Sequence, residues 1–541
     1  MEQVSFDYLI VGAGSAGCVL ANRLSADENC SVLLIEAGGS DRHPLVKLPI
    51  GWTQISYNDN YNWGYRIAPS EMTAQRPMVW PRAKMMGGCS STNGMIYIRG
   101  QSLDYDHWAQ LGNHGWGWDQ VLPYFKRSED YAGTAEQADV NHGVGGALHV
   151  STVKPTVIGD MYLRACAEQG IATVDDLNRG DQKGAAYFDV TVKKGRRQNT
   201  VSAFLKPIKS RKNLTIMKRS RVNRVLFEGK NAVGIELVCK DKVHKVFARR
   251  EVILSAGAIN SPQLLQLSGV GNKTLLERHG IKTVVDLPGV GENLQDHLGA
   301  IVANHITAPL GLNAELKSHR LIYNLYLYIT KGQGILNFPA ADVGGFFCSD
   351  LSLERPDLQI HFTRVSGDRD IDNNSTLDTL PGVTSIAYLT RPESRGSVKI
   401  IDSDVSVAPI IEANYLATEN DRKALITGVK RLREIFASES LADVMGQELR
   451  PGKAVESDED IMAYIQKYGT TGFHPVGTCK MGNDEQAVVD DQLCVHGLSS
   501  LRVVDASIMP TLISGNTNAA TIMIAEKGAD MILAAKWRVK E

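Results

Sequence analysis

A glycine-rich segment near the amino terminus constrains the fold more than any other feature. An apolar run, Tyr8–Val11, precedes the sequence GAGSAG at residues 12–17, and a 3.6-residue hydrophobic period follows over Cys18–Leu24. A second apolar run, Ser31–Ile35, ends at Glu36. This order of strand, turn, helix and strand is typical of a dinucleotide-binding unit. The segment therefore predicts a nucleotide bound at the start of the first helix.

The three glycines of this fingerprint have separate physical roles. Gly12 permits the tight turn, Gly14 lets a pyrophosphate approach the backbone, and Gly17 lets the helix pack closely on the strand. Unpaired N–H groups and a partial positive charge at the helix start favour phosphate. Glu36 is placed to accept the ribose hydroxyls and would repel the 2′-phosphate of NADP. On the fingerprint alone, an NAD-dependent enzyme fits this pattern.

Length and composition exclude several classes of protein. A chain of 541 residues is long enough for two or more domains, and 43% apolar with 22% charged residues is ordinary for a globular protein. A net charge of −2 argues against nucleic acid or anionic membrane as the main partner. The nearest candidate membrane segment, Leu321–Ile329, is too short to span a bilayer.

The eight cysteines show neither CxxC pairs nor the spacing of a metal site. The fingerprint begins too close to Met1 for a signal peptide to precede it within this sequence. We therefore expect reduced thiols, no metal, and a cytoplasmic enzyme, either free or peripheral to the inner membrane.

Several segments are predicted from local patterns. Residues 81–100, PRAKMMGGCSSTNGMIYIRG, suit either a capped helix start or, as we favour, a loop laid against a polar ligand. Residues 141–146 are expected to form a surface loop, and residues 195–197 a solvated turn, with a basic substrate patch as the alternative at 195–197. Further on, the sequence predicts a β-meander with strands at 214–217, 221–228, 232–238 and 246–249, a buried strand at 251–258, strands at 358–363, 385–390 and 396–401, and helices at 418–436 and 519–536.

These elements predict an α/β fold, α+β overall, with a Rossmann-like nucleotide-binding domain assembled from separate segments. The segments are residues 1–150, 200–300 and 470–541. Residues 151–199 and 301–469 are expected to form a substrate-binding domain with an antiparallel sheet and helices.

Four separated motifs together resemble the glucose–methanol–choline (GMC) oxidoreductases, which are FAD-dependent, alcohol-oxidising flavoproteins. In chain order they are the fingerprint at 12–17, GGCSSTN at 87–93, GAINSPQLLQLSGVG at 257–271, and HPVGT at 474–478 with NTN at 516–518. The resemblance covers nearly the whole chain and is strongest to the choline, sorbose and aliphatic-alcohol dehydrogenase branch. It implies FAD as the cofactor.

The resemblance also implies roles for individual residues. Glu36 would hold the adenosine ribose, His474 would be the catalytic base, and Asn518 would be its partner. Thr92 replaces the histidine through which some members bind FAD covalently, so non-covalent FAD is predicted. The residues expected around the cofactor are Gly12, Gly14, Ser15, Ala16, Gly17, Glu36, Ala37, Gly87, Asn93, Gly94, Met95, Ile96, Val222, Ala256, Asp505, Ala506, Asn516 and Ala519.

A physical case for His474 stands beside the resemblance. Oxidation of an alcohol requires removal of a hydroxyl proton, and an imidazole suits this step. Pro475 biases the backbone of His474 towards an extended conformation, from which a loop side chain can project into a cavity. The alternative is a hydrogen-bonded structural histidine. Beside it, Phe473 either lines the pocket or packs in the core.

Asp342 stands where some choline-oxidising relatives carry a longer carboxylate. The shorter side chain weakens any inference to a quaternary-ammonium substrate, and a structural hydrogen-bonding role is the equal alternative.

The predicted function is oxidation of a small-molecule alcohol, with oxygen, a quinone or a cytochrome as electron acceptor. No nucleic acid, membrane-spanning segment or particular oligomeric state is indicated. A hydroxynitrile lyase with structural FAD is the alternative on the same fold. A light-driven decarboxylase is disfavoured because those relatives lack this active-site histidine.

Overall fold

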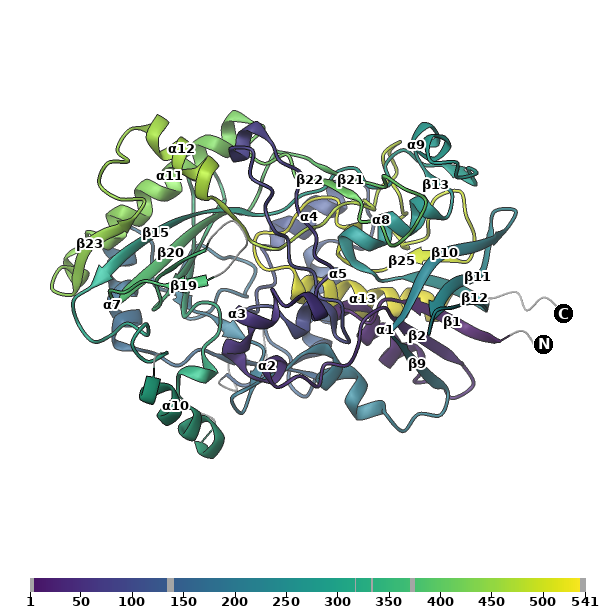
Figure 1. The fold of residues 1–541 in the computed structure, drawn as a ribbon, viewed down its shortest axis with the longest axis horizontal. Helices are drawn as coiled ribbons and strands as arrows, with labels where there is room; N and C mark the ends of the chain where they lie inside the picture. The colour runs from purple at the N-terminus through teal and green to yellow at the C-terminus, as the bar shows by residue number, and fades with distance from the viewer. Residues whose placement is uncertain (1–3, 134–140, 317, 332–333, 370–374, 536–541) are drawn as a thin grey trace.

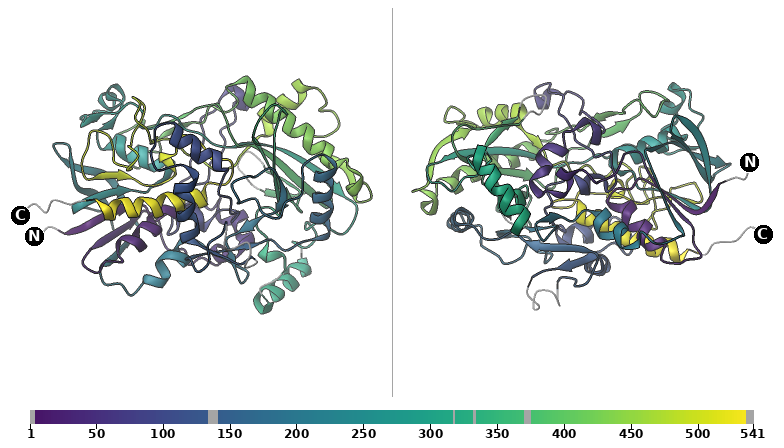
Figure 2. Two further views of the ribbon diagram at one scale, coloured as in Figure 1. Left: turned by 180° about the vertical axis from the view of Figure 1, so that it is seen from behind. Right: turned by 60° about the horizontal axis from the view of Figure 1, so that its bottom comes forward.

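Two seven-stranded sheets organise the chain, one on each side of the view in Figure 1. The coordinates are a computed structural model that describes residues 4–133, 141–316, 318–331, 334–369 and 375–535. The amino and carboxyl ends approach the same side of the molecule, beside the first sheet (Figures 1 and 2). The predicted α/β class with a separate antiparallel sheet is therefore confirmed.

The first sheet has the order β10-β11-β12-β1-β2-β9, and β25 pairs with β12. Its strands are β1 (Ser5–Val11), β2 (Val32–Glu36), β9 (Leu214–Lys218), β10 (Ser220–Glu228), β11 (Asn231–Cys239), β12 (Lys242–Leu254) and β25 (Leu501–Val503). All of β2 is buried, as its continuous apolar sequence predicts for a central parallel strand. Helices α1 (Ser15–Leu24) and α13 (Asn518–Ala534) pack against each other beside this sheet.

The predicted meander is correct for three of its four strands. β9 instead pairs in parallel with β2 at the far edge of the sheet. β12 is continuous where two strands were predicted, because its first half pairs with β11 and its second half with β1 and β25. One long strand thereby carries the chain from the meander into the parallel core.

The second sheet is antiparallel and has the order β23-β15-β20-β17-β16-β5, with β24 paired to β15. Its strands are β5 (Gly184–Tyr187), β15 (Leu298–Ile306), β16 (Val343–Phe347), β17 (Leu358–Thr363), β20 (Gly382–Leu389), β23 (Met445–Arg450) and β24 (Thr470–Thr471). Helix α11 (Glu419–Phe436) packs on β20, and both this helix and the strand at 358–363 were predicted.

Side chains alternate between the two faces of β17, as strand geometry requires. Leu358, Ile360 and Phe362 join the core under α11. His361 and Thr363 point to the other face and line a cavity. One face of the sheet therefore packs against α11, and the other face lines the cavity.

The remaining elements are shorter or lie around the two sheets. They are α2 (Pro44–Lys47), α3 (Trp52–Ile55), α4 (Ser102–Gln110), α5 (Trp118–Ser128), β3 (Glu129–Tyr131), β4 (Leu148–Thr152), α7 (Val157–Glu168), β6 (Asp189–Val190), β7 (Val192–Lys193), β8 (Arg196–Arg197), α8 (Gly257–Leu267), β13 (Val270–Gly271), α9 (Lys273–Arg278), β14 (Val285–Asp286), α10 (Ser318–Lys331), β18 (Gly367–Arg369), β19 (Ser375–Leu377), β21 (Ser397–Lys399), β22 (Ile410–Glu412) and α12 (Asp458–Tyr468). No helix among the described residues is long and apolar enough to span a bilayer. The boundaries of the two predicted domains stay a prediction.

Two segments predicted to be solvated contain buried charged groups. Arg197 is 3% exposed, and its guanidinium donates to the oxygens of Val46, Ser90 and Asn93. His142 is 1% exposed and lies between two carboxylates. Local sequence polarity was misleading here because the partners of both residues are distant in sequence.

Gly17 provides a steric test of how α1 packs on β1. A Cβ atom at Gly17 would lie 1.9 Å from the Gly12 carbonyl oxygen. We expect Gly17→Ala to lower the free energy of unfolding by about 1–3 kcal/mol because the helix must move off the strand. Gly39→Ala is the control, since its Cβ would meet no heavy atom closer than 3.8 Å. Equal urea-unfolding midpoints for the two variants would contradict this account.

Candidate active site

A cavity of about 350 Å³ is lined by residues of both sheets and by loops distant in sequence. Most of the residues predicted around a cofactor line it: Gly12, Gly14, Ser15, Ala16, Glu36, Ala37, Asn93, Gly94, Met95, Ile96, Val222, Ala256, Asp505, Ala506 and Asn516, together with Phe473, His474 and Asn518. Gly17, Gly87 and Ala519 are not in the lining, although each adjoins a segment that is. Asp342 lies outside it.

Glu36 ends β2 with its carboxylate at the cavity wall. Its two oxygens accept hydrogen bonds from the backbone N–H groups of Ala13, at 3.0 Å, and Gly38, at 2.7 Å. Burial raises the pKa of Glu36 to about 7, although these two hydrogen bonds act in the opposite direction. The carboxylate is therefore fixed and weakly solvated, which suits a group that accepts the hydroxyls of a ribose.

Two helix amino ends meet at the cavity. α1 begins after Gly14, and α13 begins at Asn518. The Ser15 hydroxyl donates to the Asn518 side-chain oxygen over 2.7 Å and thereby joins the two ends. Both ends offer unpaired N–H groups and partial positive charge, an arrangement that fits an anionic group such as a pyrophosphate.

The loop at 87–93 lies directly against the fingerprint. A Cβ at Gly88 would be 2.7 Å from the Gly14 Cα, so the close approach depends on glycine. Arg197 donates to the Asn93 side-chain oxygen at 2.7 Å, and burial lowers the pKa of Arg197 to about 9. The segment is a 3₁₀ turn over Gly88–Ser91 rather than the start of an α-helix. The prediction of a loop against a ligand fits this geometry.

Hydrogen bonds to two side chains, Asp296 and Arg82, hold the loop that carries His474. Asp296 accepts from the His474 backbone N–H at 2.6 Å and from the Thr471 hydroxyl at 2.5 Å. Arg82 donates to the Phe473 carbonyl oxygen at 2.7 Å. Phe473 has φ of +63°, a conformation that costs free energy for a non-glycine residue and is maintained here by these hydrogen bonds.

The hydrogen bonds of His297 define the proton positions on His474. The Nδ1 atoms of the two rings are 2.9 Å apart, and Nε2 of His297 is 3.1 Å from the Thr390 carbonyl oxygen. Because a carbonyl can only accept, His297 donates through Nε2 and accepts through Nδ1. His474 therefore donates through Nδ1, which leaves a lone pair on its Nε2.

His297 is buried, His474 is half-buried at the cavity, and both are neutral. Burial lowers the pKa of His297 to about 4. Burial also lowers the pKa of His474 well below its ordinary value, and His297, His361 and Arg82 add to this shift. A neutral imidazole whose Nε2 carries a lone pair is the form that can accept a proton.

Asn516, rather than the predicted Asn518, is the asparagine beside His474. Its side-chain nitrogen lies 3.1 Å from His474 Nε2, and its oxygen accepts from Gln359 at 3.3 Å. The prediction was wrong because Asn518 opens α13 and accepts from Ser15 instead. Asn516 precedes the helix in a turn at Gly515, whose φ is +134°, and this turn gives it a different direction.

Several cavity residues were missed by the sequence analysis. They come from the second sheet and from residues 52–82: Trp52, Tyr57, Trp63, Arg82, His361, Thr363, Ile386 and Tyr388. Burial lowers the pKa of His361 to about 3, and within the described part of the chain its Nε2 has no hydrogen-bond partner. The polar residues at alternate positions of β17 were the available signal.

Asp342 forms an ion pair with Arg364, with 2.6 Å between the carboxylate and Nε. Its side chain is buried and absent from the cavity lining. This geometry favours the structural alternative for Asp342.

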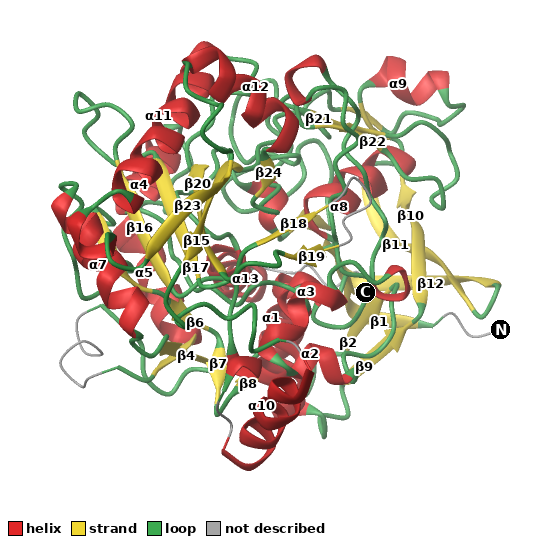
Figure 3. Ribbon diagram, turned by 60° about the vertical axis from the view of Figure 1, so that its left-hand side comes forward, coloured by secondary structure: helices red, strands yellow, loops and turns green. Residues whose placement is uncertain are grey.

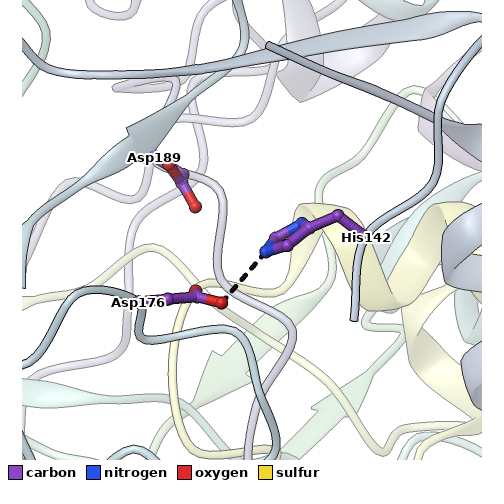
Figure 4. Close-up of side chains that lie close together, drawn as sticks. All are labelled: His142, Asp176 and Asp189. Atoms are coloured by element: carbon purple, nitrogen blue, oxygen red, sulfur yellow. Dashed lines mark hydrogen bonds and ion pairs between the residues drawn. The ribbon is translucent and has the colours of Figure 1, made fainter. Parts of the chain in front are cut away.

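His142, Asp176 and Asp189 lie close together outside the cavity lining (Figure 4). His142 Nε2 is 3.0 Å from Asp176, and its Nδ1 is 3.0 Å from Glu129. Although burial acts in the opposite direction, these two carboxylates raise the pKa of His142 to about 8. Both ring nitrogens are therefore donors, so the arrangement is an ion-pair network rather than a metal site.

Comparisons with known proteins agree with this geometry. Sequence models of the GMC oxidoreductase family match residues 6–299 and 392–525. An alcohol dehydrogenase [acceptor] of Pseudomonas putida is 42% identical, covering 98% of this chain and 96% of the relative. The mitochondrial choline dehydrogenase of Mus musculus is 41% identical, covering 97% and 89%.

Solved structures show the same fold. Pyridoxine 4-oxidase from Mesorbium loti is 31% identical with a TM-score of 0.87, covering 97% of this chain and 98% of that one. A formate oxidase is 26% identical with a TM-score of 0.91, covering 99% of each chain. These relatives are named as dehydrogenases and oxidases, so they give no support to the lyase alternative.

The two asparagines form a matched pair for a test. We expect Asn516→Ala to slow flavin reduction by an alcohol by about 10²–10³-fold, the usual cost of losing a donor to a developing negative charge. Asn518→Ala should leave this rate nearly unchanged once FAD is bound and weaken retention of FAD, because it removes the contact between the helix ends. Stopped-flow bleaching without oxygen measures the rate, and the reverse ranking would restore Asn518 as the partner.

Proposed function

The chain belongs to the GMC oxidoreductase family, and on that premise we propose that His474 is the base with which it oxidises an uncharged primary alcohol. Its cofactor is FAD, and the enzyme is an oxidoreductase of CH–OH donors. The observation that carries the proposal is the Nε2 lone pair of His474, which faces the cavity beside the Asn516 amide.

His474, Asn516 and Asp296 have separate roles in alcohol oxidation. His474 Nε2 accepts the hydroxyl proton while its Nδ1 stays hydrogen-bonded to His297. The Asn516 amide donates to the substrate oxygen as negative charge develops there. Bound FAD would supply the acceptor for the hydride that leaves the alcohol carbon. Asp296 holds the backbone of the base so that its ring keeps one orientation.

The same cavity provides contacts for FAD. Glu36 suits the ribose, the start of α1 suits the pyrophosphate, and residues 93–96 are placed for the flavin end. Thr92 supports non-covalent attachment, because the family position for a histidyl link holds a hydroxyl. Mild acid or denaturant would then release the flavin. The eight cysteines are free, which supports a reducing compartment such as the cytoplasm.

The charges around the cavity favour an uncharged alcohol. Its acidic lining residues, Glu36 and Asp505, both belong to the nucleotide-binding side, and Asp505 already accepts from Gly257 N and Ser261. Near His474 the lining includes the cation Arg82. Trp63, a surface suited to a quaternary ammonium, already has the Lys84 ammonium 4.8 Å from its ring.

Choline and its uncharged carbon isostere, 3,3-dimethylbutan-1-ol, test this preference. We expect the isostere to reduce the flavin with a kcat/KM at least about tenfold higher, which corresponds to roughly 1.4 kcal/mol of transition-state stabilisation. Oxygen-free bleaching compares the two alcohols, and repeats in air and with an artificial dye identify the class of acceptor. A higher kcat/KM for choline would contradict the charge argument.

The pKa of His474 predicts the pH dependence. The base acts in its neutral form, and its pKa lies below the ordinary value of 6.5. The rate of flavin reduction should therefore be constant through neutral pH and fall only as acid protonates the imidazole. His474→Ala should be about 10²–10⁴-fold slower and lack this acidic limb. A wild-type rate that already declines as pH falls from alkaline to neutral would contradict the assignment.

A further inference from the structure

Gln359 is a buried polar residue that contacts the asparagine of the active site. It lies on β17 in the second sheet (Figure 3), two positions before His361 and therefore on the same face of the strand. Its side chain is fully buried, and its amide nitrogen donates to the Asn516 side-chain oxygen over 3.3 Å. Gln359 is not part of the cavity lining, so it acts on the reaction through Asn516.

The direction of this hydrogen bond follows from the groups on the other side of Asn516. The Thr390 carbonyl fixes the proton positions on His297 and, through that ring, on His474, whose Nε2 is left as an acceptor. Asn516 therefore turns its NH₂ group to Nε2, 3.1 Å away, and its oxygen to Gln359. Gln359 must meet that oxygen with its own NH₂ group. The hydrogen bonds thus run in one direction, from the Gln359 amide to the Thr390 carbonyl.

Proton transfer to His474 creates a competing arrangement. Once Nε2 carries a proton it is a donor, and an Asn516 amide turned by half a rotation would offer it an oxygen. The Asn516 NH₂ group would then point away from the substrate oxygen, where negative charge develops. It would also meet the NH₂ group of Gln359, so both amides would have to turn together. Because buried side chains are closely packed, such a paired rotation is unfavourable.

We propose that Gln359 is a positioning residue that keeps the Asn516 NH₂ group directed at the substrate oxygen during proton transfer. The proposal rests on the proposed roles of His474 and Asn516. Within the described part of the chain, the Gln359 oxygen has no hydrogen-bond partner, whereas a buried amide with a purely structural role would normally have both of its ends satisfied. The bond that is made is the one to Asn516.

Gln359→Met tests the proposal in the holoenzyme. Methionine is close to glutamine in size but has no donor, so Asn516 becomes free to turn. We expect oxygen-free flavin reduction by a primary alcohol to be about 5–10-fold slower, the usual cost of one lost hydrogen bond. The loss should lie in kcat with KM nearly unchanged, because the Asn516 contact strengthens only as charge develops on the substrate.

The pH profile gives a readout that a structural role would not change. A freely turning Asn516 can accept from protonated His474 and raise its pKa, so the acidic limb of the rate should move to higher pH in Gln359→Met. The other groups that influence this pKa are unchanged in the variant: His297, His361 and Arg82. In an Asn516→Ala background, the same methionine should change neither the rate nor the acidic limb, because its effect passes through the missing amide.

Gln182→Met is the matched control. Gln182 is also a buried glutamine, at 1% exposure, and it lies outside the cavity lining. Neither atom of its amide has a hydrogen-bond partner among the described residues. This variant should keep the wild-type rate and pH profile. Gln359→Glu is a second test variant in case methionine disturbs folding or retention of FAD. It keeps the length of the side chain, its ionised carboxylate cannot donate to Asn516, and flavin reduction should again be slower.

Two results would overturn the proposal. One is a folded Gln359→Met enzyme with the wild-type rate and acidic limb, and the other is an equal loss of rate in the wild-type and Asn516→Ala backgrounds. Failure of the proposed function looks different. In that case His474→Ala and Asn516→Ala would themselves leave flavin reduction unchanged, and the role of Gln359 would fail with them.

Discussion

The hydrogen bond between His297 and His474 is the interaction on which the arrangement of the site depends. It joins three regions of the fold: Thr390 follows β20, His297 precedes β15, and His474 follows β24. The proton on His474 Nδ1 is therefore held in place by the second sheet, while Asn516 reaches the same ring from the segment that leads into α13 on the first sheet. The second sheet thus sets the tautomer of the base, and the first sheet brings the Asn516 amide to its other ring nitrogen.

The parts of this structure that could be predicted are those encoded by local periodicity. The fingerprint, β17 and α11 were correctly placed because their apolar spacing reports directly on strand and helix faces. The parallel pairing of β9 with β2 was not predicted, because an edge strand looks the same in sequence whichever partner it has. Arg197 and His142 were wrongly expected in solvent, since burial of an ion depends on partners brought together only by the tertiary fold.

The same limit separates the two asparagines of the NTN motif. The sequence places both near the base, but Asn516 lies in the turn before α13 whereas Asn518 begins the helix, so the two side chains leave the backbone in different directions. Asn518 is the first residue of α13 and Asn516 lies before it, so the helix boundary decides which one faces His474. His297 and Asp296 were missed for a related reason: their role consists of holding His474, and nothing local in NLQDH indicates that partner.

Charged side chains beside the cavity are buried without an ion-pair partner, and this bears on which substrates the cavity favours. Glu36 and Arg197 are both buried beside loops that line the cavity, and neither forms an ion pair among the described residues. Each instead uses backbone or amide partners, which keeps the charge in place and limits its movement. A substrate that added its own charge would need a counterion from a wall in which the acidic groups already have partners. An uncharged alcohol needs none.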